Sequence, residues 1–133
     1  MKARFERALE GRCRLYVPFP AVFEVANHIV DGRDGRARVV LAQRFVADVL
    51  KSYEQSVPFV ITPHVDEESL KTLLRVFSGE FAQQKIGLTD ASIIAEARRL
   101  KSKYGKEARV HIWTKDVRLK AHEPNSESDA FVG

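Results

Sequence analysis

The sequence predicts an α/β protein with a three-layer α/β/α sandwich built on a parallel sheet. Three short runs, at residues 14–19, 57–62 and 109–114, are rich in valine, isoleucine and aromatic residues and lack the strict polar alternation of half-exposed strands. The segments between these runs have the apolar spacing of helices. Strands that alternate with helices pair in parallel through right-handed crossovers, which places helices on both faces of the sheet.

Two helices are predicted between the first and second strands, at residues 20–30 and 39–53. The first opens with Pro20, which is tolerated at a helix start, and it stops before Asp31 and Gly32. The second repeats large apolar residues on one face, namely Leu41, Phe45, Val46, Val49, Leu50 and Tyr53. The N-terminal stretch MKARFERALEG also has the pattern of a helix rather than of a strand.

Two more helices are predicted between the second and third strands. The helix at residues 67–77 starts behind Asp66 as N-cap and ends at Gly79. The next lies in IGLTDASIIAEARRL, residues 86–100, with Thr89 as N-cap, and it ends near Gly105. Its expected inward face consists of Ile93, Ile94, Ala97 and Leu100.

Length and composition indicate one globular domain at residues 1–124, followed by a polar C-terminal tail at 125–133. No apolar run approaches the roughly 20 residues needed to span a bilayer, and the first residues are too charged for a secretory signal peptide. The single cysteine, Cys13, excludes an intramolecular disulfide and a cysteine-based zinc site. We therefore expect a cytoplasmic protein.

Positive charge is concentrated in one part of the chain. The net charge is +4, but residues 81–120 hold ten Lys or Arg against four Asp or Glu and so carry +6. Such a segment is typical of proteins that bind a partner rich in phosphate, because phosphate contacts supply most sequence-independent affinity for nucleic acids. An ordinary solvated basic surface is the alternative.

Three acidic residues are expected at one edge of the sheet. Asp116 directly follows the third strand, Glu24 lies in the helix after the first strand, and Asp90 lies at the start of the helix that leads back to the third strand. Active groups of parallel sheets collect at the carboxyl ends of the strands. Mg²⁺ and Mn²⁺ prefer carboxylate oxygens. Each acid alone also has an ordinary explanation; Asp90, for example, suits the helix dipole, which is worth about 0.3–1 kcal/mol.

Three stretches of the chain resemble the PIN-domain nucleases, and in particular the VapC-type toxins. They are VFEVANHI around Glu24, GLTDASIIAEA around Asp90 and WTKDVRL around Asp116. The resemblance implies a PIN-like fold in which the three acids are catalytic residues and ligands of Mg²⁺ or Mn²⁺ in a carboxylate quartet that hydrolyses RNA phosphodiesters. Thr114 matches the polar residue that the family places two before its last Asp. The implied partners are RNA and an antitoxin protein, and we also expect a homodimer.

The chain departs from the family at its N-terminus. Family members begin with a central strand that supplies the first carboxylate, and no apolar run precedes Arg14 here. The fold is therefore expected to be incomplete at the N-terminus, either because the protein continues upstream of Met1 or because it is a degenerate member. With three carboxylates of four, this form is expected to be a poor or inactive ribonuclease.

Other functions remain open on the sequence alone. A PIN-like module that binds RNA or a protein without cleaving is the main alternative. A signalling receiver domain also clusters acids, but Lys115 is followed by Asp116 rather than by the proline that receivers carry. Arginines and lysines at 33–38 and 98–106 are candidates to hold an RNA backbone, and His28 and His111 are assigned no role.

Overall fold

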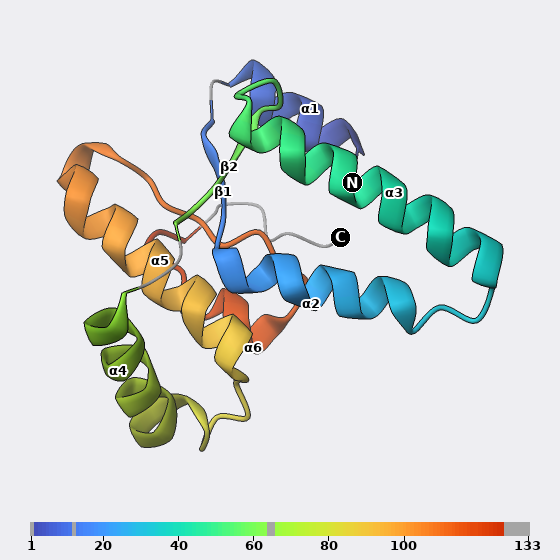
Figure 1. The fold of residues 1–133 in the computed structure, drawn as a ribbon. Helices are drawn as coiled ribbons and strands as arrows, with labels where there is room; N and C mark the ends of the chain where they lie inside the picture. Colours follow the sequence, from blue (N-terminus) through green and yellow to red (C-terminus); the bar gives the residue numbers. More distant parts are fainter. Residues whose placement is uncertain (1, 12, 64–65, 127–133) are drawn as a thin grey trace. The chain divides into compact units, whose positions relative to one another are not determined.

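A computed structural model describes residues 2–11, 13–63 and 66–126. The chain divides into two compact units, Met1–His64 and Val65–Gly133. Their positions relative to one another are not determined, so each unit is described by itself (Figure 1). Most of the expected tail at 125–133 lies outside the described residues, and its separation from a single domain at 1–124 stays a prediction.

The first unit contains two of the three predicted strands and pairs them in parallel. Leu15 lies opposite Phe59 and Val17 opposite Ile61, and the Thr62 N–H extends the ladder by donating to the Val17 carbonyl at 2.9 Å. Both strands are shorter than predicted. The elements in order are α1 (Lys2–Glu10), β1 (Leu15–Val17), α2 (Phe19–Val30), α3 (Gly35–Tyr53) and β2 (Phe59–Ile61).

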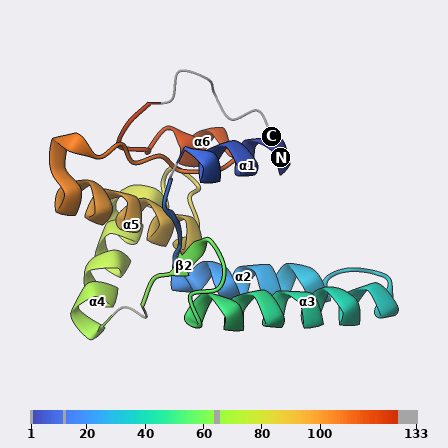
Figure 2. The ribbon, with the colours of Figure 1, turned by 90° about the horizontal axis from the view of Figure 1, so that it is seen from above.

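Helices α2 and α3 form a hairpin in which the two helices lie side by side (Figures 1 and 2). Helix α3 begins four residues before its predicted start. The Asp34 carboxylate caps it by accepting from the backbone N–H groups of Arg36 and Ala37 at 2.9 and 3.2 Å. The apolar periodicity begins only at Val39, so it could not reveal the polar first turn.

The second unit packs helices around one apolar core. Its elements are α4 (Glu67–Val76), a π-helix η1 (Phe77–Phe81), α5 (Leu88–Tyr104), a 3₁₀ turn η2 (Gly105–Glu107) and α6 (Val117–Lys120). Phe81 and Ile94 are its largest fully buried side chains. The cluster of buried residues is formed by Leu73, Phe81, Ile86, Ala91, Ile94, Ala97, Ile112 and Leu119.

Helix α4 starts where the sequence predicts it to start but does not end at Gly79. Asp66 is the N-cap and accepts from the Ser69 backbone N–H at 2.8 Å. After Val76 the chain widens into the π-helix η1 and runs through Gly79 to Phe81. A π-turn holds one more residue than an α-turn. The ring of Phe81 at its end is only 1% exposed.

The cap of α4 makes a pH-dependent contribution to stability that an Asp66→Ala variant should reveal. The Ser69 backbone N–H, bound to the carboxylate, holds the pKa of Asp66 below its ordinary range. Because the pKa of Asp66 is lower in the folded chain than in the unfolded chain, its ionised form stabilises the fold at pH values above the unfolded pKa of about 4. This stabilisation is lost as the pH falls through the folded pKa. We therefore expect the urea midpoint of Asp66→Ala to lie below that of the wild type at neutral pH. The gap should shrink in acid, and a gap that stays constant with pH would contradict this account.

Helix α5 confirms the predicted inward face but not the predicted cap. Ile94, Ala97 and Leu100 are buried, and the helix ends at Gly105, whose φ of +68° favours glycine. The N-cap is Gly87 rather than Thr89, which lies inside the first turn. The Thr89 carbonyl accepts from the Ser92 hydroxyl.

The third strand predicted from the sequence, at residues 109–114, is not a strand in the structure. Residues 109–114 join no ladder among the described residues, and backbone groups of Val110 and Ile112 bind to residues 120–125. The described sheet therefore has two strands, and the three-layer sandwich stays a prediction. Residues 2–10 form α1 and so supply no central strand.

Candidate metal site

Asp116 lies two residues after the segment 109–114 and caps α6. Its carboxylate accepts from the Arg118 backbone N–H at 2.9 Å and pairs with the Arg118 guanidinium at 3.4 Å. Its own backbone N–H donates to the Thr114 hydroxyl at 3.1 Å. The backbone N–H of Arg118, with its guanidinium, holds the pKa of Asp116 below the ordinary range.

Asp90 belongs to the same unit as Asp116. It lies in the first turn of α5 and is half-buried. The next residue, Ala91, shares the core cluster with Leu119 of α6, and Figures 1 and 2 both show α6 beside the start of α5. The two acids thus come from neighbouring elements joined by one core.

Glu24 belongs to the other unit. It lies on an exposed part of α2, where its carboxylate approaches His28 one turn later at 3.8 Å. Within the described part of the chain, no three or more His, Cys, Asp or Glu are grouped closely enough to hold a metal ion. Neither unit alone therefore supplies a complete set of three ligands.

The arginines and lysines at 33–38 and 98–106 differ in whether their side chains already bind other groups of the protein. Arg98 pairs with Glu80 at 3.4 Å, and Arg99 pairs with Glu96 at 2.6 Å. The Lys101 ammonium donates to the Ala108 carbonyl at 2.8 Å. These side chains are less free to bind a phosphate than the sequence suggests.

The start of α3 and the loop before it offer more available cations. Arg38 is held there, because its guanidinium donates to the Gly32 carbonyl at 2.7 Å. Arg33 and Arg36 are exposed, and in the residues that the structure describes their guanidinium groups form no ion pair. These two arginines are the best placed of this group to contact an external anion.

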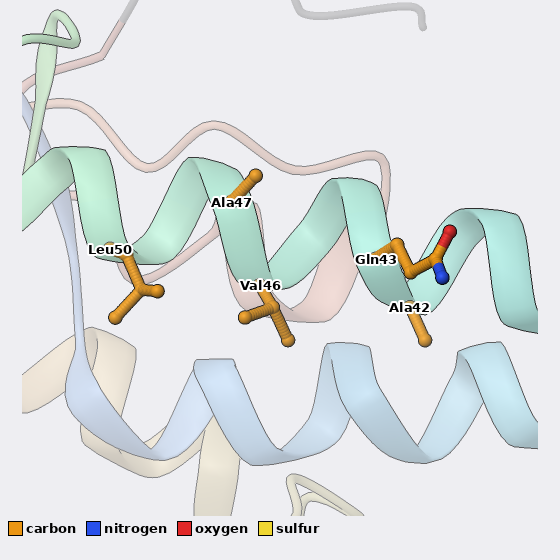
Figure 3. A pocket seen from close by; sticks show the side chains of 5 residues that line it. All are labelled: Ala42, Gln43, Val46, Ala47 and Leu50. Atoms are coloured by element: carbon orange, nitrogen blue, oxygen red, sulfur yellow. The ribbon is translucent and has the colours of Figure 1, made fainter.

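The hairpin of the first unit leaves large apolar side chains exposed on α2 and α3. A shallow groove of about 440 Å³ is lined by Ala42, Gln43, Val46, Ala47 and Leu50 of α3. Figure 3 shows Ala42, Val46 and Leu50 pointing to the α2 side of α3. Large side chains more than half exposed on α2 and α3 are Phe23, Val30, Val39, Val40, Leu41, Val46, Leu50 and Tyr53. The helical periodicity marks this apolar face, but it cannot show that the face stays uncovered.

No protein-family model matches the chain, and neither a curated protein nor a solved structure gives a significant match.

Proposed function

We propose that this protein is a metal-dependent endoribonuclease of the PIN-domain type and the toxin of a toxin–antitoxin pair in the cytoplasm. The observation that carries the proposal is the position of Asp90 and Asp116 on neighbouring elements of one unit. The motifs around Glu24, Asp90 and Asp116 add the resemblance to PIN nucleases. In the described ranges, every helix is too short or too polar to cross a membrane.

The donor set suits a hard divalent cation. Glu24, Asp90 and Asp116 would hold Mg²⁺ or Mn²⁺ through carboxylate oxygens, the ligands that these ions prefer. A bound ion of this kind supplies an activated water and stabilises charge on phosphate oxygens. The Arg118 guanidinium pairs with Asp116 and would reduce the repulsion between acids brought to one site. Thr114 fixes the backbone at Asp116.

The experiment that tests this function is cleavage of single-stranded RNA. The chain should be assayed as it is and with an added N-terminal strand that ends in Asp, each with Mn²⁺ and with a chelator. We expect chelator-sensitive fragments from the extended chain and little cleavage by the 133-residue form. Strong cleavage by the short form would show that the first carboxylate is dispensable.

A PIN-like module that binds RNA or protein without cleaving is the second candidate. The specific observation in its favour is that, among the described residues, no three potential ligands are grouped. An extended chain that binds RNA but never cleaves it would favour this candidate.

RNA binding should depend on Arg33 and Arg36. Their exposed guanidinium groups can contact phosphates, so a double Arg33→Ala and Arg36→Ala variant should bind single-stranded RNA more weakly. The slope of log affinity against log salt should fall by about 0.7 for each phosphate that the variant no longer neutralises. Fluorescence anisotropy over a range of salt concentrations measures both quantities. Arg99→Ala is the matched control, since this arginine is engaged by Glu96, and an equal loss of affinity in both variants would refute a specific role for the loop.

Protein partners should use the apolar face of the hairpin. We propose an antitoxin as the partner in the cell and a homodimer for the isolated chain, because several large apolar side chains of α2 and α3 are exposed and exposed apolar surface can mark an interaction site. Leu50→Asp, which puts a charge beside the groove, should shift the mass measured by light scattering from dimer to monomer. Ala37→Asp adds the same charge to the exposed first turn of α3 and should leave the dimer intact. A wild-type monomer at high concentration would contradict the dimer.

A further inference from the structure

The segment that joins η2 to α6 in the second unit carries Trp113, the single tryptophan of the chain (Figure 1). Trp113 is 38% exposed, whereas its neighbour Ile112 is only 3% exposed and belongs to the core cluster. Val110, two residues before Ile112, packs against the same cluster. The segment therefore places Val110 and Ile112 against the core and leaves part of the Trp113 surface accessible to solvent.

Hydrogen bonds from the C-terminal part of the chain hold the backbone of this segment. The Val110 N–H donates to the Asn125 side-chain oxygen at 2.9 Å, and the Val110 carbonyl accepts from the Asn125 backbone N–H at 3.1 Å. The Ile112 N–H donates to the Glu123 carboxylate at 3.1 Å, and the Ile112 carbonyl accepts from the Lys120 ammonium at 3.0 Å. Trp113 thus follows a backbone that is already fixed, so a ligand that binds its ring has less conformational entropy to overcome.

Cationic side chains lie on both sides of Trp113 in the same segment. Arg109 and Lys115 are exposed. Residues 109–118 hold three Lys or Arg against one Asp, and the carboxylate of that residue, Asp116, is paired with Arg118. Proteins that bind single-stranded nucleic acids combine such cations, which contact phosphates, with exposed aromatic rings on which bases stack.

We propose that Trp113 is a base-stacking platform for single-stranded RNA and that Lys115 contacts a phosphate of the same strand. The inference rests on the proposed function only in taking RNA as the partner, and it requires neither a metal ion nor cleavage. Loss of one stacked base typically weakens binding about 5- to 150-fold. A polyanion without bases has no ring to stack, and the bases of a duplex are already stacked on one another.

Fluorescence of Trp113 tests the stacking directly, because no other tryptophan contributes to the signal. The 133-residue chain is titrated with a short oligouridylate, and the anisotropy of the labelled oligonucleotide is followed in parallel. We expect the Trp113 fluorescence to fall to a plateau with the same midpoint as the anisotropy. Heparin and a short RNA duplex should leave the fluorescence nearly unchanged. Equal quenching by heparin would overturn the stacking role.

Two substitutions separate aromatic stacking from apolar packing. Trp113→Leu keeps a large apolar side chain but has no aromatic face, so it should bind the oligouridylate about fivefold or more weakly. Trp113→Phe keeps an aromatic face and should retain most of the affinity. Lys115→Ala should lower the slope of log affinity against log salt by about 0.7. Equal affinities of the Leu and Phe variants would overturn the stacking role.

The matched control is Tyr104→Leu at the end of α5. Tyr104 is 40% exposed, but the Lys103 ammonium lies over its ring, 5.3 Å from the ring centroid. This variant should bind the oligouridylate as tightly as the wild type, and a loss as large as that of Trp113→Leu would refute a specific role for Trp113. If Trp113→Leu fails to fold, the quenching of the wild-type chain decides the question.

The outcomes for this inference and for the proposed nuclease are distinct. RNA that binds without quenching Trp113 would overturn the stacking role and leave the proposed function standing. Quenching by RNA, together with an extended chain that never cleaves, would support the stacking role and overturn the nuclease. A chain that binds no RNA would overturn both.

Discussion

Adding a β-strand that ends in Asp upstream of Met1 is expected to raise Mn²⁺-dependent RNA cleavage by about 100-fold or more. In a PIN-type quartet a fourth carboxylate would add one ligand and one negative charge, so metal affinity and water activation should both rise. The comparison is a single-turnover cleavage assay of the extended and the 133-residue chains at equal concentration.

The control for this gain is the same extension ending in Asn. It restores the shape of the strand but not the charge, so it should leave cleavage close to that of the short chain. Equal activity of the Asp and Asn extensions would mean that the strand acts through folding rather than through its carboxylate.

Replacing either proposed ligand of the second unit should abolish the restored activity. Asp116→Asn and Asp90→Asn keep the side-chain shape but remove the charge that a divalent ion needs, so each should lower the cleavage rate of the extended chain by about 100-fold or more. An asparagine at position 116 can still cap α6, so the loss of activity should come without a large loss of stability. The rate and the melting temperature are measured on the same samples.

A surface acid outside the proposed site provides the control. Asp48 pairs with Arg44 on exposed α3 at 3.3 Å, and Asp48→Asn should leave the cleavage rate unchanged. Cleavage that survives both substitutions at Asp90 and Asp116 would show that these acids are not the site.

Local signals in the sequence were sufficient for the helix boundaries that depend on local chemistry. Asp66 as the cap of α4 and Gly105 at the end of α5 were predicted because each involves a residue and its immediate neighbours. The start of α5 was misplaced by two residues, since Gly87 takes the N-cap position and leaves Thr89 inside the first turn.

Features set by distant contacts could not be read from periodicity. The π-helix runs past Gly79 to Phe81, whose ring is buried in the core of the second unit. The run at 109–114 has the composition of a strand, yet Glu123 and Asn125 occupy the backbone groups that a neighbouring strand would use. Composition indicates that a segment is extended but does not identify its hydrogen-bond partners.

The sequence predicted that Glu24, Asp90 and Asp116 lie together at one edge of the sheet; Asp90 and Asp116 belong to one unit and Glu24 to the other, so their meeting stays a prediction. The order of elements correctly placed Asp90 at a helix start and Asp116 just beyond an extended segment. The cap contacts with Arg118 and the contacts of Glu123 with Ile112 and Lys120 depend on side-chain geometry and could not be foreseen.

A crystal structure of the chain grown with Mn²⁺, analysed by anomalous scattering, tests the central claim most directly. The claim is that Glu24, Asp90 and Asp116 share one metal site. We predict an anomalous peak contacted by oxygens of all three carboxylates at about 2.1 Å, or two adjacent peaks that share them, with the carboxylate carbons within roughly 10 Å of one another. Mn²⁺ bound near Asp90 and Asp116 with Glu24 on another face, or no Mn²⁺ at these acids, would contradict the account.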